Sequence, residues 1–177
     1  LIIALIMFSF TNTTNASYEQ LAHEFSFKGI DGGEINLQNF KENVIVVVNV
    51  ASRCGFTNQY EDLQNLWSKY KNKNLVVIGV PTNNFKQEPG SNKDIKDFCE
   101  TNFNISFPMT EKIDVIGRNA HSFFEWAKEN HGTSAIPKWN FHKIIIGKDG
   151  KVADTFASIT KPSSKKFISL IEKEIKN

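Results

Sequence analysis

Two cysteines are the side chains of this chain best suited to covalent chemistry. Cys54 lies in the segment 49–57, which follows an apolar run at 44–48 and precedes a helical pattern. A buried strand therefore leads into a turn that places Cys54 at the start of a helix, where unpaired backbone N–H groups stabilise a thiolate. Most free cysteines are instead inert, buried apolar residues. Arg53 and Gly55 beside the thiol favour the reactive interpretation.

The second cysteine, Cys99, allows one intramolecular bridge to Cys54, which would close a loop of about 45 residues. A permanent structural disulfide is one interpretation, but the position of Cys54 ahead of a helix favours a bridge that forms and breaks. Thr57 stands three residues after Cys54, so the chain has no C-x-x-C motif of thiol–disulfide exchange. The four histidines and two cysteines lack the spacing of metal ligands, so we expect no metal or cofactor. We interpret the histidines as surface or core residues.

Composition indicates one folded domain. The chain has 177 residues, of which 40% are hydrophobic and 23% charged, and 15 phenylalanines are available for a core. The formal net charge is +2 without a long basic run, so neither nucleic acid nor an anionic membrane is an expected partner.

The first residues differ in composition from the rest. Residues 1–8 are apolar and uncharged, and small polar residues follow. We interpret residues 1–16 as a truncated signal peptide cleaved after Ala16, with Thr14 at the −3 position, which leaves a domain of residues 17–177. An N-terminal anchor lacking its first half is the alternative, but the run is too short to insert stably in a membrane. A cleaved leader predicts export to the periplasm or the medium; without one the protein would be cytoplasmic.

The hydrophobic pattern predicts alternating strands and helices. A strand at 44–50, a helix at 58–71 and a strand at 75–80 form a βαβ unit, which requires a right-handed crossover and parallel pairing. The remaining elements are a hairpin around 25–37, helices at 91–103 and 119–130, a hairpin at 141–156 and a closing helix at 163–175. This order predicts an α/β, thioredoxin-like fold with a central mixed sheet flanked by helices. Cys54 then lies at the carboxyl end of a core strand, where open sheets place their sites.

Several short motifs together resemble one family. They cover most of residues 20–175, and their agreement in order and spacing is far more specific than any one of them. The segments are 49–57, Gln87-Glu88-Pro89-Gly90-Ser91-Asn92, Phe107-Pro108, 112–115, Trp139-Asn140-Phe141 and Gly150-Lys151-Val152. The chain is similar to glutathione peroxidases of the cysteine-containing, non-selenium type.

The resemblance implies that Cys54 is the residue that attacks peroxide. A thiolate attacks one oxygen, the O–O bond breaks, and the cysteine becomes a sulfenic acid. The resemblance also implies that Trp139 and Asn140 supply hydrogen-bond donors that stabilise the thiolate and the developing alkoxide. The family glutamine of an Asn-Gln-Phe motif is Asn84 here, in a segment one residue shorter than usual. Whether Asn84 or Gln87 replaces that glutamine stays open.

The position of Cys99 resembles that of the resolving cysteine in two-cysteine, thioredoxin-dependent members. Thr82 stands where some other members carry a cysteine. Cys99 would attack the sulfenic acid, and a thioredoxin-like reductant would reduce the resulting disulfide. We expect the helix at 91–103 to unwind partly at each turnover, because a mid-helix thiol lies too far from a strand end to bridge. The alternatives are a buried Cys99 in a glutathione-dependent peroxidase that uses Cys54 alone, and a redox sensor that oxidises a partner protein.

The short segment 130–138 lacks the longer insertion of tetrameric family members. The resemblance therefore implies a monomer or loose homodimer with an open site for hydrogen peroxide and organic hydroperoxides. No cluster of Arg and Lys marks a glutathione pocket, which favours the thioredoxin-like donor.

Overall fold

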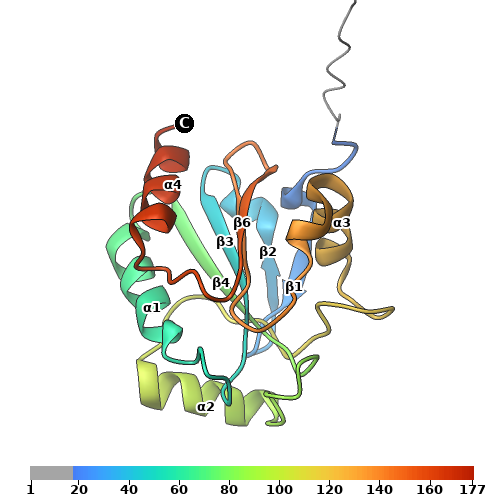
Figure 1. The fold of residues 1–177 in the computed structure, drawn as a ribbon, viewed down its shortest axis with the longest axis vertical. Coiled ribbons are helices and arrows are strands. Elements are labelled where there is room, and N and C mark those ends of the chain that lie inside the picture. The colour runs from blue at the N-terminus through green and yellow to red at the C-terminus, as the bar shows by residue number, and fades with distance from the viewer. Residues whose placement is uncertain (1–17) are drawn as a thin grey trace, which may run out of the picture.

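The computed structural model describes residues 18–177 (Figure 1). The predicted leader and its cleavage site lie outside these residues. The elements alternate as the hydrophobic pattern predicts. In chain order they are β1 (Ser26–Lys28), β2 (Glu34–Asn36), β3 (Val44–Val50), α1 (Gln59–Tyr70), β4 (Leu75–Pro81), α2 (Asn92–Phe103), α3 (Ser122–His131), β5 (Lys143–Ile146), β6 (Val152–Phe156) and α4 (Lys165–Lys176).

The central sheet has four strands in the order β4-β3-β5-β6. β3 and β4 pair in parallel, while β5 pairs antiparallel with both β3 and β6. The expected mixed sheet, with its parallel βαβ unit and its antiparallel terminal hairpin, is therefore confirmed. β1 and β2 form a separate two-stranded antiparallel sheet.

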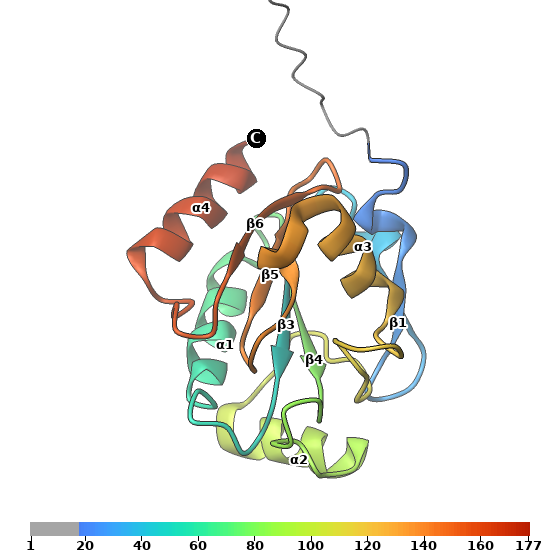
Figure 2. The same cartoon turned by 45° about the vertical axis from the view of Figure 1, so that its right-hand side comes forward.

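Helices cover both faces of the central sheet, and β3 is therefore buried along its whole length. Val46 and Val48 face a core shared with α1 and α4, whereas Ile45 and Val47 face a core shared with α3. The cartoons show the same layers, with α1 and α4 on one side of the sheet and α3 on the other (Figures 1 and 2).

Side-chain caps set the helix boundaries. Ser91 caps α2 in a reciprocal arrangement with Asp94, as its position before an apolar pattern predicts. The third helix begins later than the expected residue 119, because the His121 side chain accepts a hydrogen bond from the backbone of Phe123 and thereby caps α3. The closing helix begins after Ser164, whose side chain accepts from the backbone of Phe167.

The helix α2 lies across the carboxyl ends of β3 and β4 (Figure 2). Lys96 joins it to the β1–β2 turn through an ion pair with Asp31. The segment that follows α2 is held to α1 by Gln64, which bonds both the backbone and the hydroxyl of Ser106. No helix within residues 18–177 has the length and apolar character needed to cross a bilayer.

Candidate active site

Cys54 lies in a turn between β3 and α1. It is 9% exposed, so the thiol is close to the surface but shielded. The helix itself begins only at Gln59, and consecutive tight turns fill the interval, beginning with a bond from the backbone N–H of Thr57 to the carbonyl of Cys54. Cys54 therefore stands five residues ahead of the helix rather than at its start, and nearby turn amides take the place of the first amides of the helix.

The turn brings a donor to the sulfur. The backbone N–H of Phe56 points at Sγ of Cys54, with 3.4 Å between nitrogen and sulfur. Thr57 fixes the geometry, because its hydroxyl accepts from the backbone N–H of Cys54 at 3.0 Å and donates to the carbonyl of Ala51 at 2.9 Å. A rigid turn with an inward N–H is suited to a sulfur that carries negative charge.

A buried carboxylate fastens the other side of this turn. Oε2 of Glu88 accepts from the backbone N–H and the hydroxyl of Ser52, at 2.8 and 2.9 Å. Burial raises the pKa of Glu88, and the two bonds from Ser52 oppose that rise. The segment 87–88 is thus anchored beside Cys54.

Gln87 and Asn140 meet at this anchored segment. The carbonyl of Gln87 accepts from the backbone N–H of Arg53 at 3.1 Å. Its side-chain Oε1 accepts from Nδ2 of Asn140 at 2.9 Å. Asn140 is fully buried, and its Oδ1 has no hydrogen-bond partner within residues 18–177. The structure therefore brings the side-chain amides of Gln87 and Asn140 together at a segment that is bonded to Arg53, the residue before Cys54.

Asn84 lies in a different network. Its Oδ1 accepts from the backbone N–H groups of Val115 and Ile116, and its Nδ2 donates to Asp114 at 2.8 Å. Both ends of the amide are thereby used to hold the segment 114–116. Of the two amides that the sequence left open for this role, the structure therefore brings Gln87 to Asn140 and holds Asn84 at the segment 114–116.

Trp139 is at the surface of the site. Its side chain is 40% exposed and packs on Phe85, with 5.5 Å between ring centres. Its backbone carbonyl accepts from Nδ2 of Asn49, the polar residue near the end of β3. With Phe56 it also lines a hollow next to the Cys54 turn. Trp139 is therefore adjacent to the site, with its indole open to an incoming molecule.

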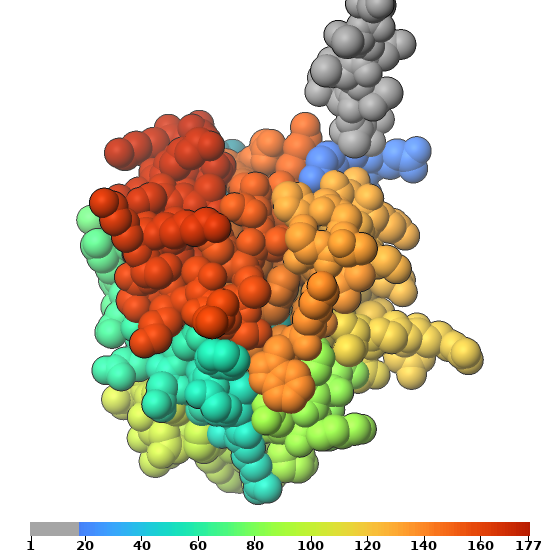
Figure 3. Space-filling model, in the orientation of Figure 1, coloured from blue at the N-terminus to red at the C-terminus, as the bar shows by residue number. Residues whose placement is uncertain are grey.

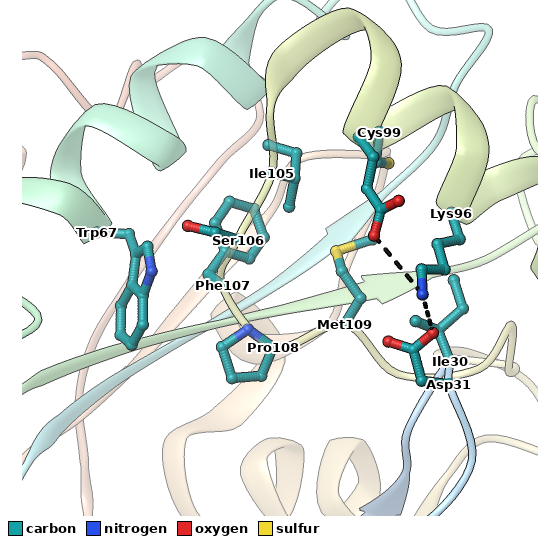
Figure 4. Close-up of a pocket in the computed structure, with 11 residues that line it drawn as sticks. Ile30, Asp31, Trp67, Lys96, Cys99, Ile105, Ser106, Phe107, Pro108 and Met109 are labelled. Carbon is teal, nitrogen blue, oxygen red and sulfur yellow. Dashed lines mark hydrogen bonds and ion pairs between the residues drawn. The ribbon is translucent and has the colours of Figure 1, made fainter.

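Cys99 lies on the buried face of α2, 2% exposed, in the same core cluster as Cys54. Figure 4 shows it on α2 above a hollow of about 350 Å³, with Lys96 paired to Asp31 nearby. Burial raises the pKa of the Cys99 thiol to about 11, and the neighbouring Tyr60 hydroxyl offsets part of that rise. Both cysteines are free thiols.

Sequence reasoning missed Thr57, Tyr60 and Glu88. The role of Thr57 could have been predicted from the sequence, because a hydroxyl side chain a few residues after a turn can hydrogen-bond to the backbone of that turn. Tyr60 lies within the helix predicted at 58–71, and nothing else in the sequence distinguishes it. Its contact with Cys99 joins α1 to α2 and depends on tertiary packing, which no local pattern reports.

Comparisons with known proteins agree with this geometry. A family model described as glutathione peroxidase matches residues 22–128. Glutathione peroxidase-like peroxiredoxin 2 of Saccharomyces cerevisiae is 43% identical over 147 residues, covering 80% of this chain and 90% of the relative. The hydroperoxy fatty acid reductase of Synechocystis is 41% identical, covering 78% of this chain and 87% of the relative.

Solved structures show the same architecture. The crystal structure of T. cruzi GPX1 matches with a TM-score of 0.69 and 30% identity, covering 89% of this chain and 98% of that one. A thioredoxin-family thiol:disulfide interchange protein from Chlorobium tepidum matches with a TM-score of 0.65 at 12% identity, covering 85% and 92%. The second likeness shows the thioredoxin-like fold alone.

The fold and the anchored cysteine turn define a thiol peroxidase that acts on hydroperoxides. The chain belongs to the glutathione peroxidase family, and the resemblance drawn from its motifs is confirmed.

Proposed function

We propose that the protein reduces hydroperoxides through a two-cysteine cycle, with Cys54 as the peroxidatic and Cys99 as the resolving residue. The observation that carries this proposal is the presence of two free thiols in one core cluster, one on a strand-end turn and one on the adjoining helix. A thioredoxin-like protein is the proposed reductant.

In the first step the Cys54 thiolate attacks the terminal oxygen of the hydroperoxide. The S–O bond forms as the O–O bond breaks, and the leaving alkoxide takes a proton to become an alcohol, or water when the substrate is hydrogen peroxide. Sulfur is oxidised to sulfenic acid. In this proposal the N–H of Phe56 stabilises the thiolate, and the Trp139 indole and the Asn140 amide, once that amide has rotated away from Gln87, donate to the oxygen on which charge develops.

In the second step the Cys99 thiolate attacks the sulfenic sulfur of Cys54. The disulfide forms as the S–O bond breaks, and the leaving hydroxide takes a proton to become water. A dithiol reductant then opens the bridge by exchange and is itself oxidised to a disulfide.

Opening of α2 has a chemical role in this step. While the helix is folded, burial raises the pKa of Cys99 to about 11, so the thiol is protonated and weakly nucleophilic at neutral pH. Unwinding exposes the thiol to water and removes this penalty. The same motion that brings the sulfurs together therefore also activates the attacking one.

Gln87 is the proposed replacement for the family glutamine. An amide can donate at one end and accept at the other, so Gln87 and Asn140 are able to exchange roles by rotation about their last torsions. In the rotated arrangement Gln87 donates to the unpartnered Oδ1 of Asn140, and Asn140 directs its N–H groups to the site.

Matched cysteine variants test the cycle. In an assay coupled through thioredoxin and its reductase to NADPH oxidation, we expect Cys54→Ser to abolish turnover. Cys99→Ser should still consume one equivalent of peroxide, which mass spectrometry detects as sulfenic acid, but should not turn over with thioredoxin. Undiminished turnover of Cys99→Ser with thioredoxin would exclude the resolving role.

The single-cysteine alternative predicts the opposite pattern. If glutathione is the direct donor, Cys99→Ser should keep its full rate with glutathione and glutathione reductase. A redox sensor would instead give a stable mixed disulfide with a partner protein on Cys54 of the same variant.

We further propose that the protein is exported and that it is a monomer or loose homodimer. Fractionation of the source cells tests the first proposal, and sedimentation of the purified protein tests the second.

A further inference from the structure

Tyr60, in the first turn of α1, lies where the cysteine turn, the Asn140 loop and α2 come together. Its backbone N–H donates to the carbonyl of Thr57, the residue that fixes the Cys54 turn. Its ring is fully buried and packs nearly perpendicular to that of Phe141, with 5.4 Å between ring centres. Since Phe141 directly follows Asn140, Tyr60 supports both sides of the peroxide site.

The same side chain also contacts α2. Its ring packs on Phe103, the last residue of that helix, with 5.3 Å between ring centres. Its hydroxyl neighbours the thiol of Cys99. Figure 3 shows α2, in yellow-green, packed beneath the turquoise start of α1. Tyr60 therefore joins the cysteine turn to the helix that carries the second thiol.

The hydroxyl of Tyr60 is buried without a hydrogen bond to any of residues 18–177. Burial raises the pKa of Tyr60 well above its ordinary value, and Cys99 and Glu88 add to the rise, so the group keeps its proton at neutral pH. The Cys99 thiol beside it is neutral as well, and the sulfur of a thiol is a weak acceptor. A buried hydroxyl without a partner destabilises the conformation that buries it, which here is the one with α2 folded.

The position of Cys99 determines whether water reaches this hydroxyl. Cys99 lines the hollow of about 350 Å³ beside α2, whereas Tyr60 is not among the residues that line it (Figure 4). In the proposed cycle, unwinding of α2 carries Cys99 away from Tyr60 toward Cys54. The space that Cys99 leaves is continuous with the hollow, so water then bonds the Tyr60 hydroxyl and removes the penalty.

We propose that Tyr60 is a positioning residue for the resolving step, because its unpaired hydroxyl destabilises the folded α2 and thereby favours release of Cys99. The inference rests on the proposed two-cysteine cycle and names a residue that sets how readily α2 opens. Removing the hydroxyl should therefore make α2 more stable. Ordinary damage to a packed core has the opposite sign, because it would loosen the helix.

Tyr60→Phe tests this direction, since it keeps the ring and removes only the hydroxyl. In the reduced protein we expect hydrogen exchange of the α2 amides to slow about ten-fold, the size of effect expected from one unpaired buried hydroxyl. After oxidation of Cys54 by one equivalent of hydrogen peroxide, disulfide formation should slow by a similar factor. Quenched-flow peptide mapping follows this step separately from the oxidation itself.

Tyr70→Phe is the matched control at the other end of α1. The Tyr70 side chain is buried too, but its hydroxyl donates to Oε1 of Glu172 at 2.6 Å. The same substitution thus removes a hydroxyl that has a partner. It should lower the free energy of unfolding in urea and leave the rate of disulfide formation unchanged.

Two variants of Cys99 test the same hydroxyl from the side of α2. Cys99→Ser introduces an oxygen that accepts a hydrogen bond from Tyr60, whereas Cys99→Ala introduces no acceptor. In the reduced protein the α2 amides should therefore exchange more slowly in Cys99→Ser than in Cys99→Ala. Equal exchange in these two variants would mean that Tyr60 gains nothing from a partner at this position, and would count against the proposal.

The remaining outcomes are distinguishable. Faster or unchanged exchange of α2 in Tyr60→Phe would overturn the proposal, because the hydroxyl would then be bonded while the helix is folded. Slower exchange with an undiminished rate of disulfide formation would overturn its role in the resolving step. If Cys99→Ser turns over fully with thioredoxin, the two-cysteine cycle itself fails, and exchange in reduced Tyr60→Phe alone decides whether the hydroxyl governs α2.

Discussion

At the scale of single residues, the site depends on the orientation of two amides. Asn140 donates to Gln87 at 2.9 Å, and among residues 18–177 the buried Oδ1 of Asn140 then has no hydrogen-bond partner. A buried acceptor without a hydrogen bond costs about 1–3 kcal/mol. The proposed exchange of roles would give this acceptor a partner, since the amide of Gln87 can bond Asn140 in either orientation.

The first prediction concerns Gln87→Glu. A carboxylate only accepts, so it would hold Asn140 in the orientation that directs Nδ2 away from the site. Loss of one donor to the developing charge should slow oxidation of Cys54 by about 100-fold. Stopped-flow measurement of Cys54 oxidation by hydrogen peroxide checks this. Asn84→Asp is the control, because it makes the same amide-to-carboxylate change at a side chain that is bonded to the segment 114–116 instead of Asn140. Equal slowing by both substitutions would remove the special role of Gln87.

Lys143 is a fully buried amine at the start of β5. Its Nζ donates to Oε1 of Gln59 at 2.5 Å and to the carbonyl of Thr160 at 2.7 Å. Burial lowers its pKa to about 7, and Asp62 opposes the shift. The lysine thereby joins α1, just after the cysteine turn, to the loop that carries Ile159.

The second prediction is a pH dependence of stability. Between about pH 7 and pH 10 the unfolded chain holds the Lys143 proton more than the native state does. The free energy of unfolding should therefore rise with pH in this window, by at most about 1.4 kcal/mol per unit. Lys143→Met should flatten the rise in urea titrations between pH 7 and pH 9. A slope that persists in the variant would assign it to other groups.

At the scale of elements, the proposed two-cysteine cycle requires α2 to move. Asn104 ends this helix in the left-handed conformation, with φ 51°, and its N–H bonds the last carbonyls of α2. Asparagine tolerates this conformation better than alanine does. The end of α2 is thus held by one backbone position close to Cys99.

The third prediction uses that position. Asn104→Ala should weaken the end of α2 by about 1 kcal/mol and, where opening limits the resolving step, speed disulfide formation about five-fold. Asn74, with φ 60° between α1 and β4, offers a matched control. Asn74→Ala should lower global stability similarly without changing the rate. Quenched-flow peptide mapping measures the rate of disulfide formation in both variants. Equal rates in the two variants would argue that opening of α2 does not limit the resolving step.

Most elements could be predicted from the sequence because local physics determines them. The uniformly apolar 44–50 run has to be buried on both faces, and Ser91 with Asp94 marks the start of α2 without tertiary information. The start of α1 at Gln59 lies within one residue of the predicted 58, whereas α3 begins three residues later than the predicted 119, because the cap from His121 depends on specific side-chain geometry.

The site could be predicted only in part. Motifs named Cys54, Cys99, Trp139 and Asn140 as candidate site residues, but no periodicity in the sequence indicates which amide lies beside Asn140. Asn84 turns to the segment 114–116, and Gln87 reaches Asn140 instead. The partners of these two amides depend on where two loops distant in sequence meet, and that position is set only when the sheet has assembled.

At the scale of the whole molecule, the sheet and α2 contribute differently to the fold. The strands β3, β4 and β5 carry the core, whereas α2 lies outside the sheet layers, across the strand ends (Figure 2). A bridge between Cys54 and Cys99 closes a long loop and removes entropy from the unfolded chain, worth about 4 kcal/mol in the chain-entropy model. The oxidised molecule can therefore lose the order of α2 and remain folded.

The fourth prediction follows from this division. Hydrogen exchange should show that oxidation by one equivalent of peroxide removes protection from the amides of residues 92–103, while those of β3, β4 and β5 keep theirs. Reduction by a dithiol should restore the protection, and Cys99→Ser should show no loss under the same treatment. Protection that stays unchanged in the disulfide-bonded protein would mean that the two sulfurs meet without unwinding. The burial of Cys99 would then have to be relieved by movement of the Cys54 turn, and the activating role assigned to α2 would be wrong.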